Sequence, residues 1–146
     1  MRAGAATILD MTSKHLVAWL VTFVVMLVID LLWLGVIAKG LYQQGMGNLL
    51  SPEPRLGIAA LFYLMYPVGL VIFAVMPGAD ANSVLRAGVL GALFGLFAYA
   101  TYDLTNLAIV RNWPVALSFI DIAWGTLVSG VSATAGAMAW RWMASR

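Results

Sequence analysis

Four long apolar stretches alternate with short polar segments along this chain, and this pattern predicts membrane-spanning helices. We expect helices over about residues 16–37, 54–76, 84–110 and 115–140. Each stretch is close to the roughly 20 apolar residues that an α-helix needs to cross a bilayer. The predicted fold class is therefore an all-α integral membrane protein, built as a four-transmembrane-helix bundle.

The segments outside these helices complete the predicted organisation. Residues 1–14 show no periodic pattern, and we expect a flexible N-terminal extension before a single transmembrane domain over 15–146. The longest connection, residues 39–51, mixes Gly, Gln and Asn with Leu, Tyr and Met, which favours a loop lying partly in the membrane interface. Pro67 predicts a kink in the second helix, and Pro77-Gly78 is expected to end it.

Cap patterns mark where two of the helices should start. Ser51-Pro52-Glu53 combines a cap residue, a proline and an acid, as helix N-termini often do. Asn112-Trp113-Pro114 has the same character, and we expect Asn112 to cap the fourth helix.

Composition agrees with a membrane protein and excludes several functional classes. The chain is 63% hydrophobic and 10% charged, whereas soluble domains carry about 25% charged residues. The absence of cysteine excludes disulfides and thiolate metal sites, and the single histidine, His15, excludes a bis-histidine haem within one chain. Its 8 Lys and Arg residues are scattered over the connections, so they form no nucleic-acid patch. The expected partner is the lipid bilayer.

Basic residues at the helix ends predict the orientation. An even number of crossings places both termini on the same side of the membrane. Basic residues on that side outnumber those on the other, which favours cytoplasmic termini under the positive-inside rule. The first group is Arg2, Lys14, Arg86, Arg141 and Arg146, and the second is Lys39, Arg55 and Arg111.

Three acids lie inside the predicted spans, and they are the main functional signal. Asp30, Asp103 and Asp121 belong to the first, third and fourth helices, and no Lys or Arg accompanies them there. A charge at that depth costs about 2.5 kcal/mol or more, so an intramembrane acid is a functional-site hypothesis by default. At 1.5 Å per residue, each lies roughly 10 Å below the same, non-cytoplasmic face. We therefore predict that the three carboxyl groups meet at one level.

The residues around these acids suggest a polar site walled by aromatic rings. On the third helix, glycines that include Gly91-x-x-x-Gly95 line one face, and polar side chains continue along the same face. On the second helix, Tyr63 and Tyr66 are predicted to lie at the same depth as the acids. The pattern Ile-Asp-x-x-Trp occurs twice, ending in Trp33, expected in the outer aromatic belt, and in Trp124, expected to wall the cavity. The predicted binding residues are Asp30, Asp103, Asp121, Asn106, Tyr99, Tyr102, Tyr63, Tyr66, Trp124 and Trp33.

The run Tyr99-Ala100-Thr101-Tyr102-Asp103-Leu104-Thr105-Asn106-Leu107-Ala108, followed by Trp113-Pro114 and Asp121-x-x-Trp124-Gly125, resembles the bacterial multi-pass membrane family catalogued as domain of unknown function 2177. The segments Asp30-Leu31-Leu32-Trp33-Leu34-Gly35 and Phe62-Tyr63-x-x-Tyr66-x-x-Gly69 are similar to its earlier blocks. The resemblance covers about Leu16 to Trp140 and implies a multi-pass protein of the bacterial inner membrane. It assigns no chemistry to the site.

The residues themselves support three functional hypotheses. The first is binding or transport of a cation or a small polar molecule, because clustered carboxyl groups share protons and titrate as a unit. A homodimer is expected of a transporter this small, with Gly91-x-x-x-Gly95 available either for that contact or for packing within the bundle.

The second hypothesis is a membrane-embedded enzyme that acts on a lipid-like substrate. It would use either a divalent cation, with Asp30, Asp103 and Asp121 as candidate ligands, or a carboxyl acid–base pair. No named catalytic signature is present, so the sequence leaves enzymatic activity open. The third hypothesis is an accessory membrane subunit whose acids hold the helices together through hydrogen bonds.

Overall fold

The computed structural model describes the backbone of residues 2–146 and the side chains from Thr12 onward. Its elements are α1 (Arg2–Leu32), the π-helical turn η1 (Trp33–Ile37), α2 (Lys39–Met46), the 3₁₀ turn η2 (Gly47–Leu49), α3 (Leu56–Leu70), the π-helical turn η3 (Val71–Val75), α4 (Met76–Asp80), α5 (Val84–Ile109) and α6 (Val115–Ala144). No strand occurs over residues 2–146, which confirms the all-α fold class.

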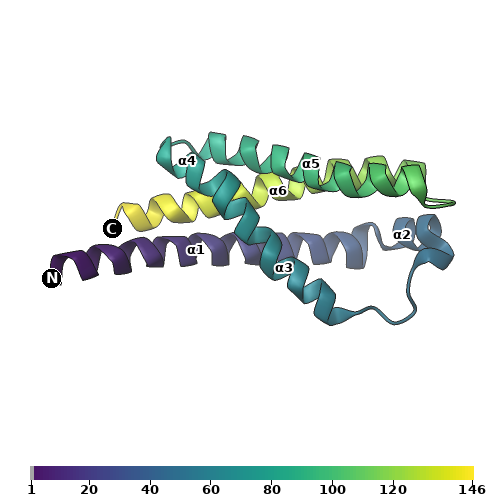
Figure 1. The fold of residues 1–146 in the computed structure, drawn as a ribbon, viewed down its shortest axis with the longest axis horizontal. Coiled ribbons are helices and arrows are strands. Elements are labelled where there is room, and N and C mark those ends of the chain that lie inside the picture. Colours follow the sequence, from purple (N-terminus) through teal and green to yellow (C-terminus); the bar gives the residue numbers. More distant parts are fainter. Residues whose placement is uncertain (1) are drawn as a thin grey trace.

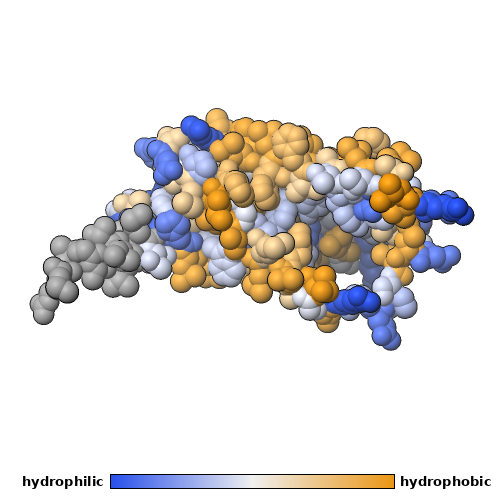
Figure 2. Space-filling view, in the orientation of Figure 1, coloured by the Kyte–Doolittle hydropathy of each residue, from blue (hydrophilic) through white to orange (hydrophobic). Residues whose placement is uncertain are grey.

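Four helical segments of the described chain are long and apolar enough to cross a membrane. They are Thr12–Ile37, Leu56–Asp80, Val84–Ile109 and Val115–Ala144. In Figure 1, α5 lies along α6, α1 runs beside α6, and α3 crosses the bundle obliquely, with both termini at one end. Figure 2 shows apolar side chains over the middle of this face and hydrophilic ones towards its two ends. This distribution is the one expected of a bundle that spans a bilayer.

Several predicted helix boundaries shift in the structure. α1 extends back to Arg2. Flexibility was predicted for residues 1–14, but side chains are described only from Thr12 onward, so this flexibility stays a prediction. The cap expected at Ser51 is wrong, because its hydroxyl bonds Glu53 across a tight turn and α3 begins only at Leu56. The residue flanking α6 is Pro114, whereas Asn112 adopts a left-handed conformation in the preceding turn.

The segment 39–51, predicted to be a loop, is largely helical. α2 occupies residues 39–46 and continues into the turn η2. The helix forms because its apolar side packs on the bundle, where Gly45 lies against Leu117 of α6. The single interfacial loop is thus replaced by a short helix at the end of the bundle opposite the termini (Figure 1).

The second span also continues further than expected. Pro77-Gly78 does not end it, since α4 runs on to Asp80. The π-helical turn Val71–Val75 ends two residues before Pro77. A π turn moves carbonyl groups out of the regular ladder, so the proline ring is accommodated without ending the helix. The kink predicted at Pro67 stays a prediction.

The glycine line of α5 packs against α6 within the same chain. A Cβ at Gly91 would meet Ala133 and the Ser129 carbonyl, and a Cβ at Gly95 would collide with the Gly125 carbonyl. The helices therefore approach with backbone close to backbone, as small-residue faces allow in membranes. The motif Gly91-x-x-x-Gly95 serves this internal contact, and the homodimer stays a prediction.

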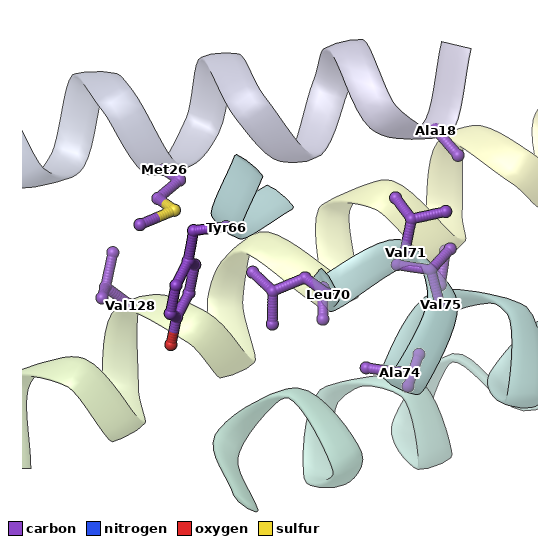
Figure 3. Close-up of a cluster of buried hydrophobic side chains, with 11 residues drawn as sticks. Ala18, Met26, Tyr66, Leu70, Val71, Ala74, Val75 and Val128 are labelled. Carbon is purple, nitrogen blue, oxygen red and sulfur yellow. The ribbon is translucent and has the colours of Figure 1, made fainter. Parts of the chain in front are cut away.

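A compact apolar cluster joins the helices below the outer end of the bundle. Figure 3 shows Met26, Tyr66 and Val128 facing one another, with Leu70 and Val75 further along. The Tyr66 ring is buried there and its hydroxyl shares a 2.9 Å hydrogen bond with Ser129. Tyr63 and Tyr99, which pack against this cluster, line the cavity described next.

Candidate functional site

A cavity of about 770 Å³ occupies the end of the bundle that carries α2. Its wall includes the three intramembrane acids, contributed by α1, α5 and α6. The lining residues are Asp30, Leu34, Tyr42, Met46, Arg55, Ile58, Ala59, Phe62, Tyr63, Tyr99, Tyr102, Asp103, Trp113, Pro114, Leu117 and Asp121. Three acids separated widely in sequence thus border one space, at the end opposite the termini.

Asp30 is fully engaged by the protein. It is 4% exposed, and its two carboxyl oxygens accept hydrogen bonds from Tyr63 Oη (2.6 Å) and Trp124 Nε1 (2.8 Å). These donors come from α3 and α6, so the carboxyl group ties three helices together. Such an arrangement is what a structural anchor requires, because each buried polar atom has a partner.

Asp121 is bonded by a residue of the short helix α2. The Tyr42 hydroxyl donates a short hydrogen bond to Asp121 Oδ1. Burial, together with this hydrogen bond, raises the pKa of Tyr42 above its ordinary value of 10.0. The phenol therefore stays protonated and keeps donating at neutral pH, which holds α2 over the cavity.

Asp103 differs from both of these acids. It is 3% exposed, and its Oδ2 is buried without a hydrogen-bond partner among the described residues. Its neighbours are Asp121, Ser118 and Trp113, but Trp113 Nε1 donates to Ser118 Oγ (3.0 Å) and Ser118 Oγ donates to the Pro114 carbonyl (3.1 Å). The donors nearest to Asp103 thus bond other atoms, and Asp103 Oδ2 lies buried in the cavity wall without a donor among the described residues.

The two Ile-Asp-x-x-Trp segments meet through their tryptophans. The rings of Trp33 and Trp124 stack with centroids 4.2 Å apart and an interplanar angle of 7°. Trp124 donates to Asp30, and Trp33 Nε1 lies 3.5 Å from the Tyr42 hydroxyl that binds Asp121. Each ring therefore reaches toward the acid of the other segment.

The expectation that Trp124 walls the cavity is not met, because neither Trp124 nor Trp33 is among the lining residues. The aromatic belt expected for Trp33 stays a prediction. Helical side chains lean toward the N-terminus of their own helix. Trp33 directly follows α1 and Trp124 lies on α6, and these two helices run in opposite directions (Figure 1). The same lean therefore turns the two rings toward each other, which counting along a single helix does not show.

The predicted tyrosines divide into two groups. Tyr63, Tyr99 and Tyr102 line the cavity, and the Tyr99 ring lies directly against Gly125 of α6. Tyr66 is instead part of the apolar cluster, and Asn106 is half-buried outside the lining. The binding role assigned to these residues stays a prediction.

Sequence reasoning missed several lining residues, and the most important is Tyr42. It lay in a segment predicted to be a loop, and no pattern in that segment linked it to Asp121. Arg55 was considered only for the orientation in the membrane and Trp113 only as part of a helix start, yet both line the cavity. A signal for Trp113 was present, because it directly precedes the helix that carries Asp121.

The acids do not form a compact set of metal ligands. Over the residues whose side chains are described, no group of three or more His, Cys, Asp or Glu residues is placed to hold a metal ion. Asp103 adjoins Asp121, while Asp30 is held by its own donors. A divalent cation bound by all three acids stays a prediction without support from this geometry.

Comparison with known proteins identifies one family. The family described as "Predicted membrane protein (DUF2177)" matches residues 15–138, which is most of the chain. No curated protein and no solved structure matches.

Proposed function

The chain belongs to the DUF2177 family of predicted membrane proteins, and we propose that it binds a cation or a small cationic molecule in the cavity, at Asp103 and Asp121. The bundle would lie in the bacterial inner membrane with both termini in the cytoplasm, so the cavity would face the other side. Asp30 serves in this proposal as the anchor that positions α3 and Trp124.

The single observation that carries the proposal is the unpartnered oxygen of Asp103. A buried acceptor without a donor costs about 1–3 kcal/mol, so such groups are rare in folded proteins. An acid within a membrane span is a functional-site candidate by default. A bound ammonium group or other cation would supply the missing donor or charge.

The adjacent carboxyl groups suit a single positive charge. Neighbouring carboxyl groups titrate as one unit, and the proposal assigns one negative charge to the pair of Asp103 and Asp121. A monovalent cation would neutralise that charge, or would replace the shared proton. Replacement of the shared proton by a cation would couple cation transport to proton movement.

Aromatic rings provide the remaining walls. Tyr102 and Trp113 contact each other with centroids 5.7 Å apart, next to Asp103, and Tyr99 lies nearby on α5. Faces of such rings attract organic cations by about 0.5–2 kcal/mol. The combination of an acceptor pair with aromatic walls favours an organic ammonium over a strongly hydrated metal ion.

Fluorescence titration tests this proposal. The full-length protein in detergent micelles is titrated with ethanolamine and with tetramethylammonium at constant ionic strength, while tryptophan emission is recorded. We expect a saturable change that is lost in Asp103→Asn and kept in Asp80→Asn, whose acid is exposed at the opposite end. No saturable change, or an equal response in Asp103→Asn, would overturn the proposal.

A second candidate is acid–base catalysis on a lipid-like substrate, favoured by the same contact between Asp103 and Asp121. One protonated and one ionised carboxyl group can act as acid and base together. Turnover of added membrane lipids, followed by mass spectrometry, separates this candidate from simple binding. Products that depend on both acids would favour the enzyme.

A further inference from the structure

Part of the cavity wall is formed by exposed side chains of α3 and of η1, the turn that follows α1. Leu34 of η1 and Ile58 of α3 line the cavity and are 40% and 64% exposed. Both residues belong to membrane-spanning segments, so bilayer lipid is within reach of this part of the wall.

The start of α3 explains this exposure. Every residue from Leu49 to Leu61 is exposed, so the first turns of α3 are only partly covered by the rest of the bundle. Closer contact begins with Phe62 and Tyr63, where Tyr63 bonds Asp30. Figure 1 shows the first turns of α3 standing away from α1, and Figure 2 shows the surface hollowed beside them.

One basic residue stands at this part of the wall, which we call the mouth of the cavity. Arg55 directly precedes α3 and lines the cavity together with the acids. A guanidinium group at a helix end lies at the depth of lipid phosphates and binds phosphate well. The cavity thus offers carboxyl groups inside, a guanidinium group at the mouth and an apolar wall within reach of bilayer lipid.

We infer that the ligand is a zwitterionic membrane amphiphile, an aminophospholipid, which enters between α1 and α3. Its ammonium group binds Asp103 and Asp121, its phosphate binds Arg55, and its acyl chains stay in the lipid beside Ile58 and Leu34. The inference rests on the proposed function, because the ammonium group occupies the same carboxyl pair.

The charge order along the cavity matches this class of ligand. An aminophospholipid carries its ammonium group at the tip, its phosphate next and its chains last. The cavity presents the complementary order from inside to outside. A simple alkali cation would make no use of Arg55 or of the exposed apolar wall.

The test compares matched ligands on the purified full-length protein. The probes are short-chain phosphatidylethanolamine, short-chain phosphatidylglycerol, soluble phosphoethanolamine and ethanolamine, with tryptophan fluorescence as the readout. We expect phosphatidylethanolamine to bind at least tenfold more tightly than phosphoethanolamine or phosphatidylglycerol. Asp103→Asn should remove this binding.

Two variant pairs examine Arg55 and the proposed entry separately. Arg55→Gln should weaken phosphatidylethanolamine about tenfold, whereas Arg111→Gln, exposed in the α5–α6 turn and outside the lining, should not. Ile58→Trp should narrow the proposed entry and weaken the same lipid, whereas Leu61→Trp, equally exposed but outside the lining, should not.

The outcomes distinguish the two claims. If ethanolamine binds through Asp103 but phosphatidylethanolamine binds no better, the cation site stands and the lipid inference is overturned. Equal binding of phosphatidylglycerol would also overturn the lipid inference, because that lipid lacks the ammonium group. If neither ethanolamine nor phosphatidylethanolamine binds, the proposed function fails and the lipid inference fails with it.

Discussion

The two halves of the α5–α6 pair are built in opposite ways; the inner half is the one towards the termini, and the outer half is the one towards the cavity. In the inner half, Gly91 and Gly95 let the backbones touch, and small residues of α6 fill the contact. In the outer half, the same face of α5 carries Tyr99, Tyr102 and Asp103, and the helices border a cavity. The change occurs where the Tyr99 ring lies against Gly125.

The inner half of the helix pair therefore contributes stability, and the outer half contributes the proposed binding site. Close backbone contact provides dispersion and packing without polar groups, which is the main source of helix association in membranes. The outer half can then tolerate an unpartnered carboxyl oxygen, which costs about 1–3 kcal/mol. The contrast predicts that substitutions in the inner half affect folding, while substitutions at Asp103 affect ligand binding.

The largest effect is expected at Gly95. A Cβ there would collide with the Gly125 carbonyl, so Gly95→Ala forces the helices apart. Overpacking of this kind costs about 3 kcal/mol, which lowers the melting temperature by on the order of 10 °C. Thermal unfolding in detergent measures it. Gly57→Ala, where no atom lies within 4 Å, is the control and should melt like the native protein.

The next largest effect is the difference in stability between variants of Asp30 and variants of Asp103. Asp30→Leu leaves Tyr63 and Trp124 without their acceptor, so stability should fall by about 2–3 kcal/mol. Asp103→Leu removes an unpartnered acceptor, so stability should stay equal or rise, while the response to ethanolamine disappears. Chemical denaturation and fluorescence titration measure the two properties. Equal destabilisation by both substitutions would contradict the division of roles.

A smaller effect is expected from Tyr42→Phe. The change removes the hydrogen bond to Asp121 and should destabilise the attachment of α2 by about 1–2 kcal/mol. Amide hydrogen exchange over residues 39–46 should accelerate, with little change in α5 and α6. Tyr102→Phe is the matched control, because Tyr102 is 54% exposed and no described side chain hydrogen-bonds its hydroxyl. Unchanged exchange in α2 would show that Tyr42 does not hold this helix.

The smallest effect concerns alkaline pH. Burial raises the pKa of Tyr42 in the folded protein above the ordinary 10.0 of the unfolded chain. Its contribution to stability is therefore complete below pH 10 and is lost as the pH rises from there toward the folded-state pKa. Thermal unfolding between pH 8 and 11 should show a decline above pH 10 that is shallower in Tyr42→Phe. Identical slopes would contradict the assignment.

Much of the fold could be predicted because membrane spans depend on local sequence. Apolar length alone located the third helix at 84–110, and the structure has α5 at Val84–Ile109. Ser83 caps this helix through a 3.1 Å hydrogen bond from the Arg86 amide, as its residue type favours. The short helix α2 could not be predicted in this way, because its helicity depends on packing against α6.

The candidate site was predictable in depth but not in detail. Helical rise brought Asp30, Asp103 and Asp121 to one end of the bundle, and all three line one cavity. Their different states depend on partners from other helices: two donors for Asp30, Tyr42 for Asp121 and none for Asp103 Oδ2 among the described residues. The binding role of the site stays a prediction until a ligand is tested.

The sequence by itself determined the class of protein, its four spans and the depth of its acids, because burial in a bilayer requires apolar length and makes every acid conspicuous. Only the tertiary structure decided which acid is anchored, which is bonded by α2 and which keeps a buried oxygen without a partner among the described residues. It also decided that Trp33 stacks on Trp124 and that the first turns of α3 are exposed. These features depend on how side chains from separate helices meet, and the pattern along one helix does not specify that meeting.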